Sequence, residues 1–124
     1  MRPILIFAAL AAAASATSAR AASAPSLSTA VKQNLQCFVL YTIAAGTETD
    51  ETKRTGAIAG TWYFLGQIDA VDPSLDLDQA MRAEIVAMQN NPHTKEIGAA
   101  CDAQFSKRGA DLVSLGRNFH KTAQ

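Results

Sequence analysis

The fold is organised by residues 56–72, which read Gly56-Ala-Ile-Ala-Gly-Thr-Trp-Tyr-Phe-Leu-Gly-Gln-Ile-Asp-Ala-Val-Asp72. This stretch holds the only tryptophan of the chain and three of its seven glycines. It is too apolar for a loop, and it stops before Pro73 because the residue preceding a proline is disfavoured in the helical conformation. We therefore predict a central helix around which the other helices pack.

Helical spacing places the residues of this stretch on two unlike faces. Gly56 and Gly60 begin a row of small residues, and each glycine inside a helix costs roughly 1 kcal/mol relative to alanine. We expect close approach of a neighbouring helix backbone along both glycines to offset this cost. The bulky residues form the other face, and we expect them in the core: Ala57, Ile58, Thr61, Trp62, Phe64, Leu65 and Ile68.

The first 22 residues have the pattern of a secretory signal peptide. Met1-Arg2 forms a short positive region, residues 4–14 are uncharged and apolar, and a tract rich in Ala and Ser follows. We assign the signal peptide to residues 1–22, a flexible leader to 23–28 and a single helical domain to 29–124. The pattern predicts export to the periplasm or the cell exterior, and we expect no membrane span once the signal is removed.

The charge balance excludes two classes of partner. Signal removal takes away Arg2 and Arg20, so that 9 of the 11 basic residues remain against 11 acidic ones, a net charge of about −2. A nucleic-acid-binding protein would need a basic stripe, and binding to an anionic membrane surface would need a basic cluster. We therefore predict neither, and we expect any partner to be another exported protein.

Two cysteines remain in the mature chain, Cys37 and Cys101. An even pair in an oxidising compartment predicts one disulfide, and a spacing of 64 positions matches no redox or metal motif. Closing a loop of that length would stabilise the fold by roughly 4 kcal/mol in the chain-entropy model. We therefore predict a structural disulfide.

The chain shows four helical segments and no strand-like alternation. The first is capped by Ser28 or Thr29 and is expected to end at Gly46, since glycine commonly follows a helix. The second is capped by Thr49 or Asp50 and includes the central stretch.

The third segment begins after Asp76, whose spacing from Gln79 approximates a capping box, and ends near Asn90. The fourth begins at Pro92, capped by Asn91, and is expected to turn one face inward along its whole length: Ile97, Cys101, Phe105, Leu112, Leu115 and Phe119. The prediction is an all-α, small four-helix bundle-like domain whose disulfide joins the first and fourth helices.

Motifs for known chemistry are missing from the sequence. It has no His-Glu-x-x-His, no phosphate-binding Gly-Lys-Ser/Thr loop and no Gly-x-Ser-x-Gly elbow. His93 and His120 lie about 40 Å apart on a straight helix at 1.5 Å per residue, too far to share a metal. We predict no metal, no cofactor and no catalytic residue.

Trp62, Tyr63 and Asp69 are the candidates for a ligand or partner cleft. Adjacent aromatics on a helix more often belong to a core, and a carboxylate near a helix end more often faces solvent or a basic partner. Glu84, beside apolar residues of the third helix, is weighed in the same way. Two carboxylates that faced each other could perform acid–base chemistry, but sequence does not place Asp69 and Glu84 together.

A resemblance to known proteins rests on two short segments and on the position of the second cysteine. Leu35-Gln-Cys37-Phe38, Gly60-Thr-Trp-Tyr-Phe-Leu-Gly66 and Cys101 resemble the pattern of small one-disulfide helical proteins of the bacterial periplasm. These include acid-activated chaperones of the HdeA type and small periplasmic immunity proteins. The cysteine spacing is longer here than in the chaperones, and their lysine-rich end is missing, so no functional residue is carried over.

The resemblance implies a non-enzymatic protein that binds another protein, as a stress chaperone or as an inhibitor or immunity protein. A different class stays open, in which a small-ligand-binding protein or an enzyme uses a cleft near Trp62, Tyr63 and Asp69.

Overall fold

A computed structural model describes residues 26–122, which form four helices: α1 (Thr29–Thr47), α2 (Glu51–Val71), α3 (Leu77–Gln89) and α4 (Thr94–Thr122). No strand occurs within this range. The predicted all-α class is therefore confirmed. The predicted signal peptide and the first part of the leader lie outside the described residues.

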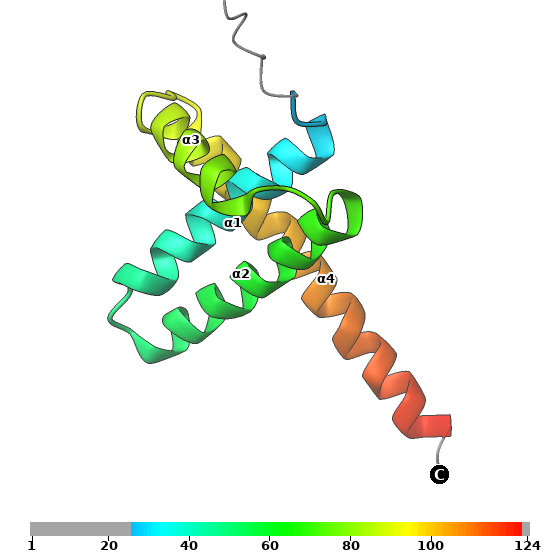
Figure 1. Ribbon diagram of the computed structural model, residues 1–124. Coiled ribbons are helices and arrows are strands. Elements are labelled where there is room, and N and C mark those ends of the chain that lie inside the picture. The colour runs from blue at the N-terminus through cyan, green and yellow to red at the C-terminus, as the bar shows by residue number, and fades with distance from the viewer. Residues whose placement is uncertain (1–25, 123–124) are drawn as a thin grey trace, which may run out of the picture.

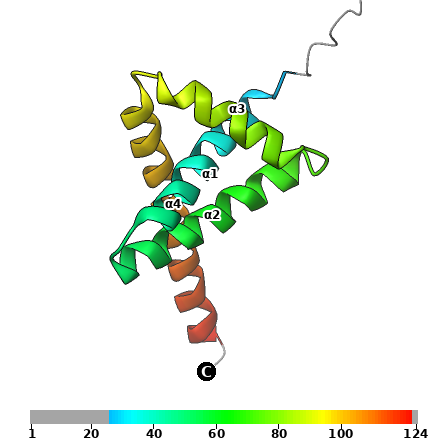
Figure 2. The same cartoon turned by 60° about the vertical axis from the view of Figure 1, so that its left-hand side comes forward.

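The four helices form a small bundle built on a hairpin. α1 and α2 run antiparallel and make the most extensive helix contact, while α3 and α4 pack across α1 (Figure 1). In both views the last turns of α4 project beyond the other helices (Figure 2). The bundle therefore consists of a packed body and one helix that leaves it.

The predicted disulfide is present. Cys37 of α1 and Cys101 of α4 are bonded through their sulfur atoms, with their Cα atoms 5.4 Å apart. Both cysteines are buried in the main apolar cluster. The bond ties the first half of α4 to α1, which confirms the predicted link between the first and fourth helices.

Three of the predicted helix starts are confirmed by their caps. The Ser28 hydroxyl accepts a hydrogen bond from the Val31 N–H at 3.2 Å. The carboxylates of Asp50 and Asp76 accept bonds from backbone N–H groups three residues later, at 2.9 and 3.0 Å. Each cap satisfies a backbone donor that the first helical turn leaves without a partner.

Two predicted boundaries were wrong, the end of the first helix by one residue and the start of the fourth by two. α1 continues through Gly46 to Thr47, and the Glu48 N–H closes the last turn on the Ala44 carbonyl. Gly46 does not have a positive φ, so its conformational freedom is not used. α4 begins at Thr94 instead of Pro92, after a turn in which the Asn91 side chain accepts the His93 N–H at 2.9 Å.

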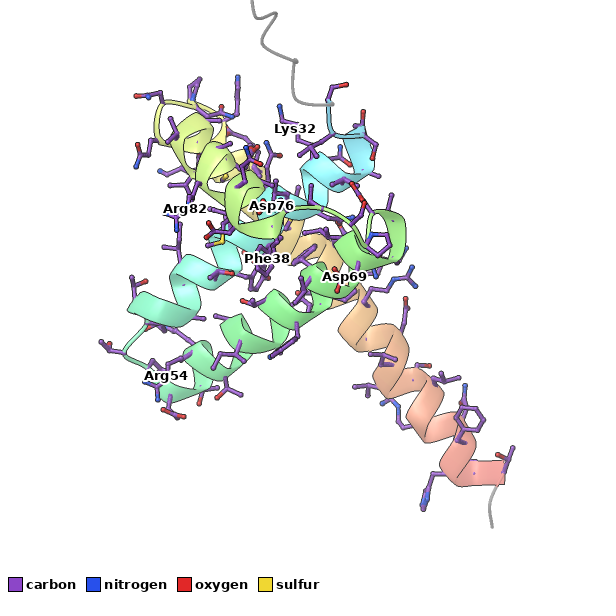
Figure 3. All side chains as sticks on the ribbon, in the orientation of Figure 1. Lys32, Phe38, Arg54, Asp69, Asp76 and Arg82 are labelled. Carbon is purple, nitrogen blue, oxygen red and sulfur yellow. A yellow bond between two sulfur atoms is a disulfide. The ribbon has the colours of Figure 1, made fainter. Side chains whose placement is uncertain are left out.

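The core lies where α1 and α2 meet the disulfide. Its largest fully buried side chains are Phe64, Leu35, Ile68, Val31 and Val39. Phe38 also lies inside, whereas Lys32, Arg54 and Arg82 extend outward at the periphery (Figure 3). Burial of such side chains contributes about 1.5–3 kcal/mol each relative to exposure, and these residues come mainly from the α1–α2 hairpin.

One of the two expected glycine contacts exists. A Cβ atom placed on Gly60 would overlap the ring of Tyr41 of α1, whereas one placed on Gly56 would meet nothing within 4 Å. A close contact therefore exists at Gly60 and not at Gly56, and the predicted approach of a helix backbone was wrong at both positions. The neighbour that needs the space is an aromatic side chain of α1 rather than the α1 backbone.

Candidate functional site

Trp62, Tyr63 and Asp69 line neither of the two cavities described for residues 26–122. Trp62 is 69% exposed, Tyr63 is half-buried and Asp69 is exposed on α2. Two cavities, of about 590 and 220 Å³, are lined by other residues. Asp69 does not line the cavity that Glu84 lines, so this cavity gives no support to acid–base chemistry by the pair.

The expected burial of Trp62 was wrong because α2 turns a different row inward. Its buried residues are Ala57, Gly60, Phe64 and Ile68. This row is a different one from that of Ile58 and Trp62, because Ala57 precedes Ile58 by one residue and adjacent residues point about 100° apart around a helix. Both Ile58 and Trp62 are exposed. α2 carries apolar residues on more than one side, so helical periodicity did not identify the side that contacts α1.

Tyr63 belongs to an aromatic cluster between α1, α2 and α4. Its ring centroid lies 4.8 Å from that of Phe64 and 5.7 Å from that of Phe105. Tyr41 joins the cluster with centroids 5.5 Å from Phe64 and from Phe105. These separations are typical of stabilising aromatic pairs, so Tyr63 has a packing role.

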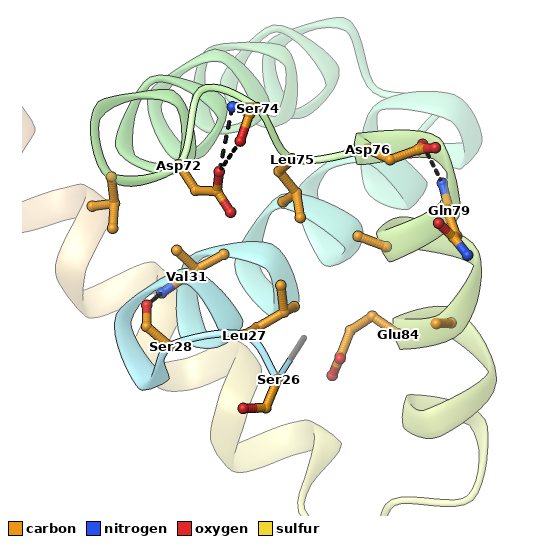
Figure 4. Close-up of a pocket in the computed structure, with 13 residues that line it drawn as sticks. Ser26, Leu27, Ser28, Val31, Asp72, Ser74, Leu75, Asp76, Gln79 and Glu84 are labelled. Atoms are coloured by element: carbon orange, nitrogen blue, oxygen red, sulfur yellow. Dashed lines mark hydrogen bonds between the residues drawn. The ribbon is translucent and has the colours of Figure 1, made fainter. Parts of the chain in front are cut away.

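The larger cavity is a groove between the start of α1, the end of α2 and the first turns of α3 (Figure 4). Its volume, about 590 Å³, lies within the range of small-molecule sites. Leu27, Val31, Leu75 and Ala80 supply apolar walls. We refer to this cavity as the α1–α3 groove.

Glu84 lines the α1–α3 groove and is the one charged side chain that is buried within residues 26–122. It is 7% exposed, and its Oε1 accepts a hydrogen bond from Gln36 Nε2 at 2.8 Å. The partner is a neutral amide. A buried carboxylate is normally paired with a cation, so this arrangement leaves the charge of Glu84 uncompensated by the described chain.

The acidic residues around the α2–α3 connection have local roles. Asp76 caps α3, and the Asp72 carboxylate accepts a hydrogen bond from the Ser74 hydroxyl at 2.9 Å. Asp78 pairs with Arg82 at 2.8 Å, and this hydrogen bond lowers the pKa of Asp78. The cluster is therefore explained by turn formation and helix capping, and it also gives the rim of the groove a negative charge.

The second half of α4 was expected to pack inward but does not. Phe105 is the last residue of α4 with a half-buried side chain, and every residue from 106 to 122 is exposed. We call residues 106–122 the α4 arm. At 1.5 Å per residue it extends about 25 Å. Its apolar side chains are open to solvent, with Leu112 68% and Phe119 65% exposed.

The arm continues the packing face of α4. Cys101 and Phe105, which contact the body, lie on the same side of the helix as Leu112 and Phe119 because these spacings are near multiples of 3.6 residues. Contact between α4 and the other helices ends at Phe105. The periodicity therefore identified the apolar face of α4 correctly, but it did not show where the packing of that face stops. No local feature of the sequence marks the position where this contact ends.

Tyr41 was not singled out from the sequence, yet it connects three helices. Its ring covers Gly60, and its hydroxyl donates a hydrogen bond to Asp102 Oδ1 at 2.7 Å. Burial, followed by the hydrogen bond to Asp102, raises the pKa of the Tyr41 hydroxyl. The spacing of Cys37 and Tyr41, one helical turn apart, was the available sign that Tyr41 faces α4.

Residues 26–122 do not place three His, Cys, Asp or Glu side chains where they could hold a metal ion together. Over the same range, no helix has both the length and the apolar character needed to cross a membrane. The chain matches no protein-family model, no curated protein and no solved structure. The resemblance to acid-activated chaperones and immunity proteins therefore stays a prediction.

Proposed function

We propose that this is an exported, non-enzymatic protein that binds another protein through the α4 arm. The observation that carries the proposal is the exposure of Leu112, Val113, Leu115 and Phe119 on a helix that leaves the body. Contiguous exposed apolar surface on a folded chain marks interaction sites. An amphipathic helix that enters an apolar groove of its partner is a recurring mode of recognition.

The net charge of the arm indicates what kind of partner surface would complement it. Residues 106–122 contain four Lys or Arg and one Asp, a net charge of +3, whereas residues 26–105 contain five basic and ten acidic residues, a net charge of −5. A partner surface that complements the arm is apolar at its centre and acidic at its rim. Charge complementarity of this kind increases the association rate and selects among partners.

Export is supported by two independent features. The Cys37–Cys101 disulfide is of the kind that persists in oxidising compartments. Residues 1–22 have the pattern of a signal peptide. If export occurs through this signal, mature protein isolated from the periplasm or medium begins within residues 17–25. Recovery of intact Met1 in that fraction would contradict it.

The shape of the arm favours an inhibitor- or immunity-type binder over a general chaperone. Its apolar face is already uncovered in the folded chain, so no acid-induced opening is needed to present it. A helix whose exposed apolar side chains have fixed positions binds best to a partner whose groove has a complementary shape. One stoichiometric partner at neutral pH is therefore the expected result, and many partners captured only in acid would support the chaperone class instead.

The test combines crosslinking with purified components. A photoreactive residue at position 113 in the arm should capture the partner, whereas the same residue at position 86 should not. Val86 is the matched control because it is an exposed valine on a different helix, α3. The partner identified in this way is then purified and titrated against the mature protein.

The double variant L112E/F119E should weaken that binding at least about thirtyfold, the loss expected from removing an interface hot spot. The variant V86E should bind as the wild type does. Equal crosslinking at both positions, or unchanged affinity of L112E/F119E, would rule out the arm as the binding surface. Sedimentation of the mature protein alone shows whether the partner is a second copy of the chain.

A further inference from the structure

We propose that the α1–α3 groove binds a small organic cation, an alkyl- or arylammonium compound, whose charged head pairs with Glu84. This site is separate from the α4 arm and does not depend on the protein-binding function. Figure 4 shows the Glu84 side chain extending from α3 toward the start of α1, on the side of the groove where Ser26 and Leu27 lie. The apolar body of the ligand would occupy the groove.

Glu84 supplies the first argument. It is nine-tenths buried, and its only hydrogen-bond partner in the described chain is the neutral amide of Gln36. The ion pairs within residues 26–122 join Arg54 to Glu51, Arg82 to Asp78 and Arg108 to Asp111, and none reaches Glu84. A buried carboxylate without a counter-charge is unfavourable, so a cation that enters the groove would offset this cost.

The walls of the groove supply the second argument. Leu27, Val31, Leu75 and Ala80 present apolar surface next to the carboxylate. A largely apolar pocket with a small number of polar groups that orient the ligand is typical of small-molecule sites, and Glu84 is the buried charged group among them. A fully polar cation, such as a metal ion, would lose its hydration against these walls without gaining the several oxygen ligands it needs.

The rim supplies the third argument. Asp72 and Asp76 border the groove, and neither forms an ion pair in the described chain. Their negative charge repels an anionic ligand and attracts a cationic one. A neutral apolar molecule would gain the burial of its body but no interaction with Glu84. The groove therefore selects a positively charged head on an apolar body.

The experiment measures the binding affinities of hexylammonium and of its neutral analogue 1-hexanol, each titrated into the mature protein in a calorimeter. Hexylammonium should bind saturably with one site per chain and at least about tenfold tighter than 1-hexanol, because a hydrogen bond to a charged group adds that much. E84Q keeps the shape of the side chain and should remove most of the preference for hexylammonium, leaving only the part that Asp72 and Asp76 contribute. E96Q alters an exposed glutamate on α4 and should preserve the preference.

A second variant protects the test against loss of folding in E84Q. Ala83 lines the groove but is exposed, so A83F fills the cavity without disturbing the core and should abolish binding of hexylammonium. Equal binding of the two probes by wild type, an unchanged preference in E84Q, or unchanged binding in A83F would each overturn the proposal. Absence of saturable binding, as when other protein segments occupy the groove, would overturn it too.

Discussion

The Tyr41 hydroxyl donates a hydrogen bond of 2.7 Å to the carboxylate of Asp102, the residue that follows the disulfide-bonded Cys101. Tyr41 itself lies one helical turn after Cys37 on α1. A covalent and a polar link therefore join α1 to α4 side by side. Together they fix the first half of α4 on the body and leave the arm to extend beyond Phe105.

Removal of the Tyr41 hydroxyl should destabilise the fold modestly. We expect Y41F to lower the free energy of unfolding at pH 7 by about 0.5–1.5 kcal/mol, the usual net contribution of one hydrogen bond. Y63F is the matched control, because within residues 26–122 the Tyr63 hydroxyl has a single, long hydrogen bond, accepted from Gln104 at 3.5 Å. Urea denaturation should show a larger loss for Y41F than for Y63F, and equal losses would contradict the role of Asp102.

The same hydrogen bond predicts an alkaline limit to its contribution. Burial and Asp102 raise the pKa of Tyr41 in the folded chain, so the folded state holds this proton more tightly than the unfolded state does. The contribution is complete below the unfolded pKa of about 10 and decreases as the pH rises above it. The stability difference between wild type and Y41F should therefore shrink above pH 10, and a difference that grows there would be inconsistent with this sign.

The two glycines of α2 should respond in opposite ways to alanine. In G60A the new methyl group overlaps the Tyr41 ring, and forced overpacking of this kind costs about 1–3 kcal/mol. In G56A the methyl group meets open space, so the higher helix propensity of alanine should add up to about 1 kcal/mol of stability. Thermal denaturation of both variants tests this, and a stabilising G60A would show that Tyr41 moves freely.

Alanine substitutions at Phe64 and Trp62 should have very different effects on stability, although the two residues are only two positions apart. Phe64 is fully buried, so F64A should lower the free energy of unfolding by about 3–5 kcal/mol. Trp62 is mostly exposed, and W62A should change the free energy of unfolding by no more than about 0.5 kcal/mol. Chemical denaturation decides between the two faces of α2, and a W62A loss comparable to that of F64A would contradict the orientation described here.

Reduction of the disulfide should lower the melting temperature by more than about 10 °C. The closed loop spans 64 positions, and the chain-entropy model assigns roughly 4 kcal/mol to a loop of that length. A domain of about 100 residues shifts by about 4–8 °C per kcal/mol. Calorimetry with and without reductant measures the shift. The variant C37S/C101S should have the same melting temperature as the reduced protein. An unchanged melting temperature would show that packing alone holds α4.

Much of the fold could be predicted because the signals are local. Ser28, Asp50 and Asp76 cap their helices through bonds to residues three positions away, so each start depends only on the neighbouring sequence. The disulfide followed from the count of cysteines, since two in an oxidising compartment have one possible pairing. Gly46 shows the limit of such signals, because a glycine ends a helix only when the chain turns there.

The candidate sites were harder to predict because they depend on which surfaces remain uncovered. Trp62 was placed in the core and Leu112 was expected on the inner face of α4, yet both are exposed. Glu84 was recognised as a carboxylate on an apolar side, but its groove requires α1, α2 and α3 to meet. No local pattern specifies that meeting.

The sequence by itself determined four helices, the caps of the first three, the apolar face of α4 and the disulfide. The helices, caps and face follow from local backbone hydrogen bonding and a period of 3.6 residues, and the disulfide follows from the presence of two cysteines. Only the tertiary structure decided which row of α2 packs against α1, where α4 leaves the body and what lines the groove. These depend on contacts between residues far apart in the chain, such as Tyr41 with Gly60 and Cys37 with Cys101. The physical reason is that burial depends on how much of a helix its neighbours cover, and the length of α4 exceeds the body that could cover it.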